Sequence, residues 1–242
     1  LKDITQQHLF QNSRNTNLQH SDDYPINDNH RFSFNVEYKI DSFNYLKFTP
    51  TFSYNETETD NITDFSFLGN SGTKNNDGST RQNSRSTSPN LNGNLLYNHR
   101  FARRGRTLSV NMSAGKSNSD GNIDYQNLST YYLPNGQTLD TNLNQRILQN
   151  NKNYNYGIRA SYVEPLSKKR SLEFNYAFNN QFTGNDKETF DVNPVSGSEK
   201  YIDSLSNIFD NIYITNRFGV NFRTNEKKYN YTVGIAVQPA TI

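Results

Sequence analysis

Eight segments of the chain, each about ten residues long, alternate between apolar and polar residues, and this pattern restricts the fold more than any other feature. In the first segment, Phe32, Phe34, Val36, Tyr38 and Ile40 occupy alternate positions, and polar residues lie between them. Successive side chains of a β-strand point to opposite faces, so a period of two predicts strands here and no helix. The other segments span residues 46–54, 91–97, 108–114, 154–162, 172–178, 212–222 and 229–237, and Leu96 and Asn216 are exceptions to the pattern.

The two faces of these segments differ in charge. The apolar face carries no Asp, Glu, Lys or Arg in these stretches. The charged residues lie on the opposite face: Glu37, Lys39, Lys47, Arg159, Glu173 and Arg217. A Lys or Arg that faces lipid costs about 2–4 kcal/mol at the bilayer midplane, and strands of about ten tilted residues are long enough to cross the hydrocarbon. We therefore expect the apolar face to contact lipid and the polar face to line a hydrated lumen.

The spacing of the turns predicts how the segments are connected. Short turns at residues 41–44, 102–105, 165–169 and 224–227 are about 60 residues apart, and long polar segments separate the resulting hairpins. Short turns on one side and long loops on the other are typical of transmembrane barrels. The sequence thus predicts an all-β, antiparallel up-and-down transmembrane β-barrel of about eight strands, a single segment over residues 1–242. Its four hairpins span about 30–57, 90–118, 152–183 and 209–238, with long outer loops between them.

Composition narrows the alternatives. The hydrophobic fraction is only 32%, yet aromatic residues reach 13%, which fits a sheet with one polar and one aromatic face better than a globular core. A net charge of +2 without a basic stripe gives no support for nucleic-acid binding, and the absence of cysteine excludes disulfides and thiolate metal sites. A soluble antiparallel sheet, with its apolar face on a protein core, remains the alternative.

Three stretches carry a resemblance to a known family: residues 29–42 with 46–54, residues 154–178, and residues 229–239. They resemble the outer-membrane β-barrel family of Bacteroidetes that is related to TonB-dependent receptors. The resemblance implies a bacterial outer-membrane location and a larger barrel of about 22 strands. It also implies a plug domain and a TonB contact elsewhere in the protein. Leu1 is not an initiator Met and no signal peptide follows, so we interpret both ends as lying within a longer barrel.

Several groups of residues are candidates for metal-binding or catalytic sites. The histidines are far apart and lack metal-site spacing, which favours exposed or interfacial positions: His8, His20, His30 and His99. Residues 75–78 and 118–124 resemble parts of calcium loops but lack the closing Glu, so Asx turns are the alternative. The alternating carboxylates Glu56, Glu58 and Asp60 could form a glycosidase-like pair, although a solvated loop explains them better.

Cations gather in three of the four short turns, at Arg103, Arg104, Arg106, Lys168, Lys169, Arg170, Lys227 and Lys228. They could contact lipid headgroups or a periplasmic partner, or they could solvate the turns and prevent edge pairing. The sequence predicts no catalytic, cofactor-binding or metal-binding residue and no enzyme activity. The leading hypothesis is a TonB-dependent receptor-like transport barrel with an unknown extracellular ligand. The alternatives are a surface adhesion or secretion-associated barrel, and a soluble carbohydrate-binding β-domain.

Overall fold

The protein forms one antiparallel sheet of long strands. The computed structural model describes residues 2–10, 13–69 and 72–242, in which the sheet has 12 strands and a single short 3-10 helix, η1. The elements are β1 (Lys2–Phe10), β2 (Ser13–Ser33), β3 (Val36–Lys39), β4 (Asn44–Leu68), β5 (Lys74–Arg100), β6 (Thr107–Tyr132), β7 (Thr138–Pro165), β8 (Arg170–Val192), β9 (Glu199–Tyr201), η1 (Asp203–Leu205), β10 (Asn207–Asn225), β11 (Asn230–Val237) and β12 (Ala240–Thr241). Within those residues, no helix is long and apolar enough to cross a bilayer.

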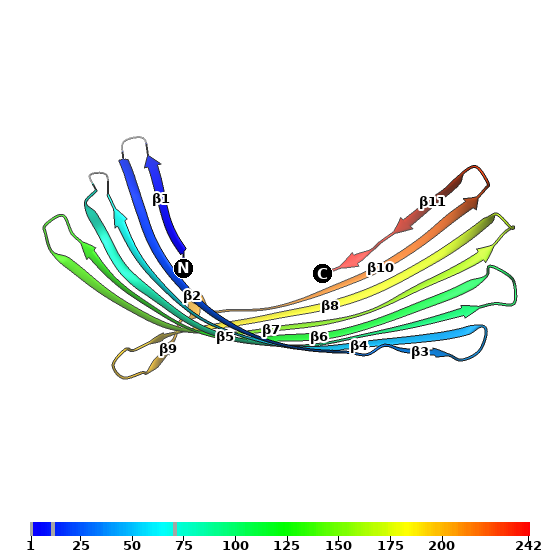
Figure 1. Cartoon of the computed structure of the whole chain (residues 1–242), viewed down its shortest axis with the longest axis horizontal. Helices are drawn as coiled ribbons and strands as arrows, with labels where there is room; N and C mark the ends of the chain where they lie inside the picture. The colour runs from blue at the N-terminus through cyan, green and yellow to red at the C-terminus, as the bar shows by residue number, and fades with distance from the viewer. Residues whose placement is uncertain (1, 11–12, 70–71) are drawn as a thin grey trace.

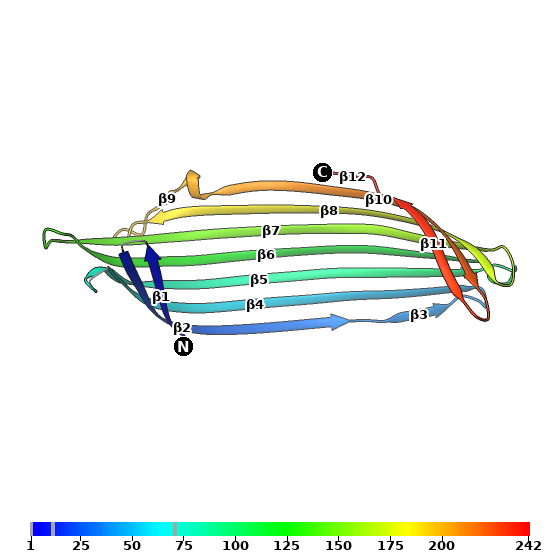
Figure 2. The same cartoon turned by 90° about the horizontal axis from the view of Figure 1, so that it is seen from above.

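The strands follow one another up and down across the sheet, in the order β1-β2-β4-β5-β6-β7-β8-β10-β11, with β3 beside β4, β9 beside β8 and β12 beside β10. Figure 2 shows the long strands side by side, and Figure 1 shows that the sheet is curved and that β1 and β11 rise at its opposite ends. The expected all-β, antiparallel up-and-down architecture is confirmed. The sheet does not close into a barrel, because β1 and β11 end the path without pairing to each other.

The first predicted strand is divided into β2 and β3, and Pro50 explains the division. Phe34 lies in the gap, and its N–H donates to the Pro50 carbonyl over 3.1 Å. In an antiparallel pair, the N–H and C=O of one residue point to the same neighbour. Pro50 has no N–H to return the bond, so the ladder is weakened where the strand is interrupted.

The four short turns lie close to their predicted positions, at residues 40–43, 101–106, 166–169 and 226–229. In the first, the Asp41 carboxylate accepts hydrogen bonds from the N–H groups of Phe43 and Asn44, both at 2.7 Å. Asp side chains favour turns because they satisfy such backbone donors locally. In the second, Gly105 has φ +87°, a conformation that glycine adopts without steric cost.

The prediction of long irregular outer loops was wrong. The polar segments continue the strands, so that β4, β5, β6 and β7 contain 25, 27, 26 and 28 residues. At this second end the chain turns within residues 133–137 and 193–198, where Gly136 and Gly197 have positive φ angles, and Gly72, between β4 and β5, has a positive φ angle as well. Strand pairing uses backbone groups alone, so a polar segment remains extended wherever a neighbouring strand continues beside it.

The sheet has no apolar core: no hydrophobic side chain of the described residues is buried. Large apolar side chains instead stand exposed along the strands, with Phe34 66% and Ile235 74% exposed. A soluble two-layer domain would bury this face, because burial of apolar surface is the main force that stabilises such domains. The exposed face therefore requires a non-aqueous environment.

Candidate membrane and lumen surfaces

Strand register brings the predicted apolar residues together on one face. Phe48, Leu95, Met112, Ile158 and Phe178 form one row across β4 to β8, because each is the register partner of the next. Parallel rows lie above and below it, two residues apart along each strand. Alternation in single segments thus becomes a continuous apolar band across the sheet.

Charged residues mark the two limits of this band. On β7 the band covers Tyr154 to Tyr162, and Lys152 and Glu164 follow at its two ends on the same face. On β4 it covers Leu46 to Tyr54, and Glu56 follows on the same face. Eight residue steps within the band, and twelve between the charged residues that flank it on β7, give roughly 26–40 Å of strand at about 3.3 Å per step, or roughly 20–30 Å across the membrane at a tilt near 40°. That height matches the apolar band of transmembrane barrels.

Aromatic side chains reinforce the band by contact between neighbouring strands. The rings of Tyr156 and Phe178 are 5.9 Å apart, and those of Tyr176 and Phe218 are 5.0 Å apart. Tyr176 and Phe218 are direct register partners and Phe178 lies diagonally from Tyr156, and both arrangements bring aromatic rings into cross-strand contact. Near the short turns, the ring of Phe101 contacts Tyr162 at 5.9 Å, which places aromatic groups at one edge of the band, as in an interfacial girdle.

Behind the apolar band, the opposite face is mainly polar. Lys47 pairs with Glu37 over 3.1 Å, and Arg223 pairs with Glu173 over 3.3 Å. Asparagines fill much of the space between these pairs, and Gly115 makes room for one such group. A Cβ at position 115 would collide with the amide oxygens of Asn92 and Asn155, its register partners on either side. A face of amides and ion pairs requires water, as the sequence predicts for a lumen.

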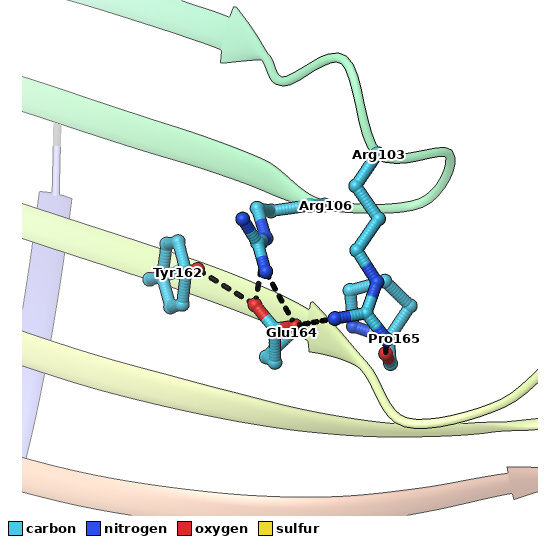
Figure 3. Close-up of polar contacts among 5 residues, drawn as sticks. All are labelled: Arg103, Arg106, Tyr162, Glu164 and Pro165. Atoms are coloured by element: carbon cyan, nitrogen blue, oxygen red, sulfur yellow. Dashed lines mark hydrogen bonds and ion pairs between the residues drawn. The ribbon is translucent and has the colours of Figure 1, made fainter.

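A compact ion cluster lies at the edge of the band beside the short turns (Figure 3). Glu164 accepts hydrogen bonds from Arg103 Nη1 at 2.7 Å and Arg106 Nη2 at 2.8 Å. Tyr162 donates its hydroxyl to the same carboxylate at 2.7 Å, and Arg103 also reaches the carbonyl of Pro165. The cluster ties the turn between β5 and β6 to the end of β7, at the level where an apolar band meets water.

Comparison with family models places these features in a known group. Residues 99–237 match the model of an outer membrane protein beta-barrel family. The chain belongs to this outer membrane protein beta-barrel family. Comparison with curated proteins found no match. The matched region covers β6 to β11, including the apolar band of those strands and the Glu164 cluster.

Family membership identifies the environment of this barrel protein's two faces. The bacterial outer membrane is its location, and its lipid contacts the exposed apolar band. Barrels of this kind have short turns on the periplasmic side. The turns that close directly beyond the band, including that of Gly105, therefore face the periplasm. The strands extend beyond the band only in the other direction, and we call these parts of the strands the outer extensions.

The described histidine side chains of this barrel protein do not cluster at one site. His20 contacts Asp3 over 2.6 Å in the outer extension, whereas His99 contacts the Asn44 side chain over 2.7 Å at the periplasmic edge. His30 is exposed in β2, and the side chain of His8 lies outside the described residues. Within the described part of the chain, no three acidic, histidine or cysteine side chains form a group suited to a metal ion.

The candidate calcium segments lie in strands, so their interpretation as loops or turns was wrong. Residues 75–78 belong to β5 and residues 118–124 to β6. Their carboxylates already have partners: Lys74 pairs with Asp77 over 2.6 Å, and Arg146 with Asp124 over 2.9 Å. Because Lys74 donates to it, the pKa of Asp77 lies below its ordinary value.

The alternating carboxylates also lie on a strand, β4, where a loop was expected. Arginines of β5 neutralise them: Arg85 pairs with Glu56 and with Glu58, and Arg81 holds Asp60 through two bonds of 2.8 and 3.2 Å. The guanidinium of Arg81 lowers the pKa of Asp60. Carboxylates paired with arginine in this way are unsuited to the proton donation that a glycosidase requires. Sequence reasoning missed these arginine partners because only the register brings them together.

Proposed function

We propose that this protein transports a ligand across the outer membrane in the manner of TonB-dependent receptors. The observation that carries the proposal is the mainly polar face with its ion pairs, which lies directly behind the lipid-facing band. In a closed barrel this face would line a hydrated passage. The extensions would contact the extracellular ligand, and a plug domain and TonB would act through the rest of the protein. No enzyme activity is proposed.

Two measurements on the intact protein test this proposal. The first labels single cysteines in outer membranes with a membrane-impermeant maleimide. The chain has no native cysteine, so Asn155→Cys on the polar face and Ile158→Cys on the apolar face make a matched pair. We expect Asn155→Cys to react and Ile158→Cys to remain unmodified. Equal modification of both positions would contradict a lumen and a lipid face.

The second measurement separates transport from the alternatives. The conductance of the intact protein is measured in planar bilayers in KCl, where a plugged transporter should conduct ions only after urea unfolds its plug. In the presence of urea, Arg159→Glu should then shift the ion selectivity of this conductance towards cations. A surface adhesion or secretion-associated barrel remains the second candidate, favoured by the long extensions outside the membrane. It predicts no change of conductance with urea. The soluble carbohydrate-binding alternative required apolar faces buried between sheets, and those faces are exposed.

A further inference from the structure

The apolar face has a hollow near its periplasmic edge. A space of about 550 Å³ lies over β7, β8, β10 and β11. The rings of Tyr162 and Phe174, 6.5 Å apart, form one wall, and the rings of Tyr176 and Phe218, 5.0 Å apart, form the other. Ala160, with its small side chain, lies opposite Tyr176 and two residues before Tyr162 on β7, so it adjoins both ring pairs. Large rings beside a small residue leave an apolar hollow in a face that contacts lipid.

The hollow adjoins the charged side chains of the short turns beyond the band, which we call the charged rim. Tyr162 belongs to both: its ring lines the hollow, and its hydroxyl donates to Glu164. From this point the chain passes through Pro165 into the turn between β7 and β8 (Figure 3). A molecule that fills the hollow would therefore have its polar end at this turn.

Positive charge exceeds negative charge at the rim. Glu164 is already shared by Arg103 and Arg106, and Glu226 pairs with Lys169 over 2.5 Å. The remaining cations are exposed and have no side-chain hydrogen bond or ion pair among the described residues: Arg104, Lys168, Arg170, Lys227 and Lys228. Lys168 lies in the turn that joins β7 to β8, and Arg170 begins β8 on the same face as Phe174 and Tyr176.

We infer that the hollow and this turn together bind an anionic phospholipid of the periplasmic leaflet. One acyl chain lies against Ala160 between the two ring pairs, and the phosphate is held by Lys168 and Arg170. Acyl chains are the apolar molecules available at this depth, and unpaired Lys and Arg beside a membrane attract anionic headgroups. A zwitterionic lipid brings its own cation to the rim, so the excess positive charge favours an anionic headgroup. This inference does not depend on transport.

Site-specific photocrosslinking in the intact protein tests the inference. Phe218 is replaced by benzoylphenylalanine, which places the reactive ketone in the wall of the hollow. The protein is reconstituted in vesicles with equal amounts of phosphatidylglycerol and phosphatidylcholine of identical chains, and the crosslinked lipid is identified by mass spectrometry. We expect phosphatidylglycerol to exceed phosphatidylcholine by at least about threefold.

Two double variants separate binding at the rim from a general effect of charge. Lys168→Gln with Arg170→Gln should abolish the preference, whereas Lys116→Gln with Lys152→Gln should retain it. The second pair removes two cations from the same face, at the opposite edge of the band. Equal crosslinking of both lipids in the parent protein would overturn the inference. So would an absence of lipid crosslinks at position 218, or an unchanged preference in the Lys168/Arg170 variant. Heat-modified migration on gels verifies that each variant is folded.

Discussion

The hydroxyl of Tyr162 donates a 2.7 Å hydrogen bond to the carboxylate of Glu164, two residues further along the same face of β7. This bond joins the last aromatic side chain of the lipid band to the first carboxylate beyond it. Glu164 is only 20% exposed as a side chain and also pairs with Arg103 and Arg106. Removal of this carboxylate's charge should therefore affect the whole turn between β5 and β6.

We predict that Glu164→Gln increases trypsin cleavage after Arg103 and Arg104 in the intact protein in detergent. The neutral amide cannot form ion pairs with Arg103 and Arg106, so the turn opens more often and the protease reaches it. Glu173→Gln is the matched control, because Glu173 lies at the same level but on the opposite face of the sheet, where it pairs with Arg223. A cleavage rate in Glu164→Gln no greater than in Glu173→Gln would show that the cluster does not hold the turn.

A cation on the apolar face should impair folding into membranes, while one on the polar face should not. Ile158 lies in the middle of the band, so Ile158→Arg should cost about 2–4 kcal/mol at the bilayer midplane. Asn179→Arg is the control, because Asn179 lies on the polar face of the neighbouring strand. The folded fraction after dilution into vesicles, read from heat-modified gel migration, should fall only for Ile158→Arg. Similar losses in both variants would refute the assignment of the faces.

The outer extension should loosen in acid because Arg81 lowers the pKa of Asp60. A carboxylate with a lowered folded-state pKa contributes stability above its ordinary pKa and loses that contribution as the pH falls through the folded-state value. Protease protection of β4 and β5 should therefore decrease as the pH falls through the ordinary pKa of 3.8 towards the lower folded-state value. Asp60→Asn should show lower protection at neutral pH and a weaker dependence on acid. An identical acid profile in Asp60→Asn would exclude the pair as the cause.

The membrane-crossing half of the fold could be predicted from sequence because lipid imposes a period of two. Lys47 and Phe48, adjacent in β4, fall on opposite faces as that period requires. The outer half obeys no such rule, since water contacts both of its faces. Thr57 and Thr59 favour strands, but polarity alone suggested a loop there, and the Asn135-Gly136 turn that marks the true hairpin end was overlooked.

The Glu164 cluster could not be predicted from sequence for a different reason. Arg103 and Arg106 lie about 60 residues before Glu164, and the strand register alone brings their side chains together. Alternation specifies which face of the sheet a residue occupies. It does not specify the register between neighbouring strands, and therefore does not specify which residue on the next strand lies opposite. The same limit concealed the pairing of Arg81 with Asp60.

Gly115 should be intolerant of any side chain, and the cause can be tested by rescue. Alanine at 115 would place its Cβ against the amide oxygens of Asn92 and Asn155, and overpacking of this kind costs about 1–3 kcal/mol. We expect Gly115→Ala to lower the urea midpoint of the intact protein, and Asn155→Ser in the same chain to restore part of the loss by making room. Gly121→Ala on the same strand is the control, because its Cβ meets only the Gln149 side chain at 3.7 Å. Equal urea midpoints for Gly115→Ala and Gly121→Ala would show that the side-chain amides of Asn92 and Asn155 move aside for the new methyl group. The polar face would then be less closely packed than its geometry indicates.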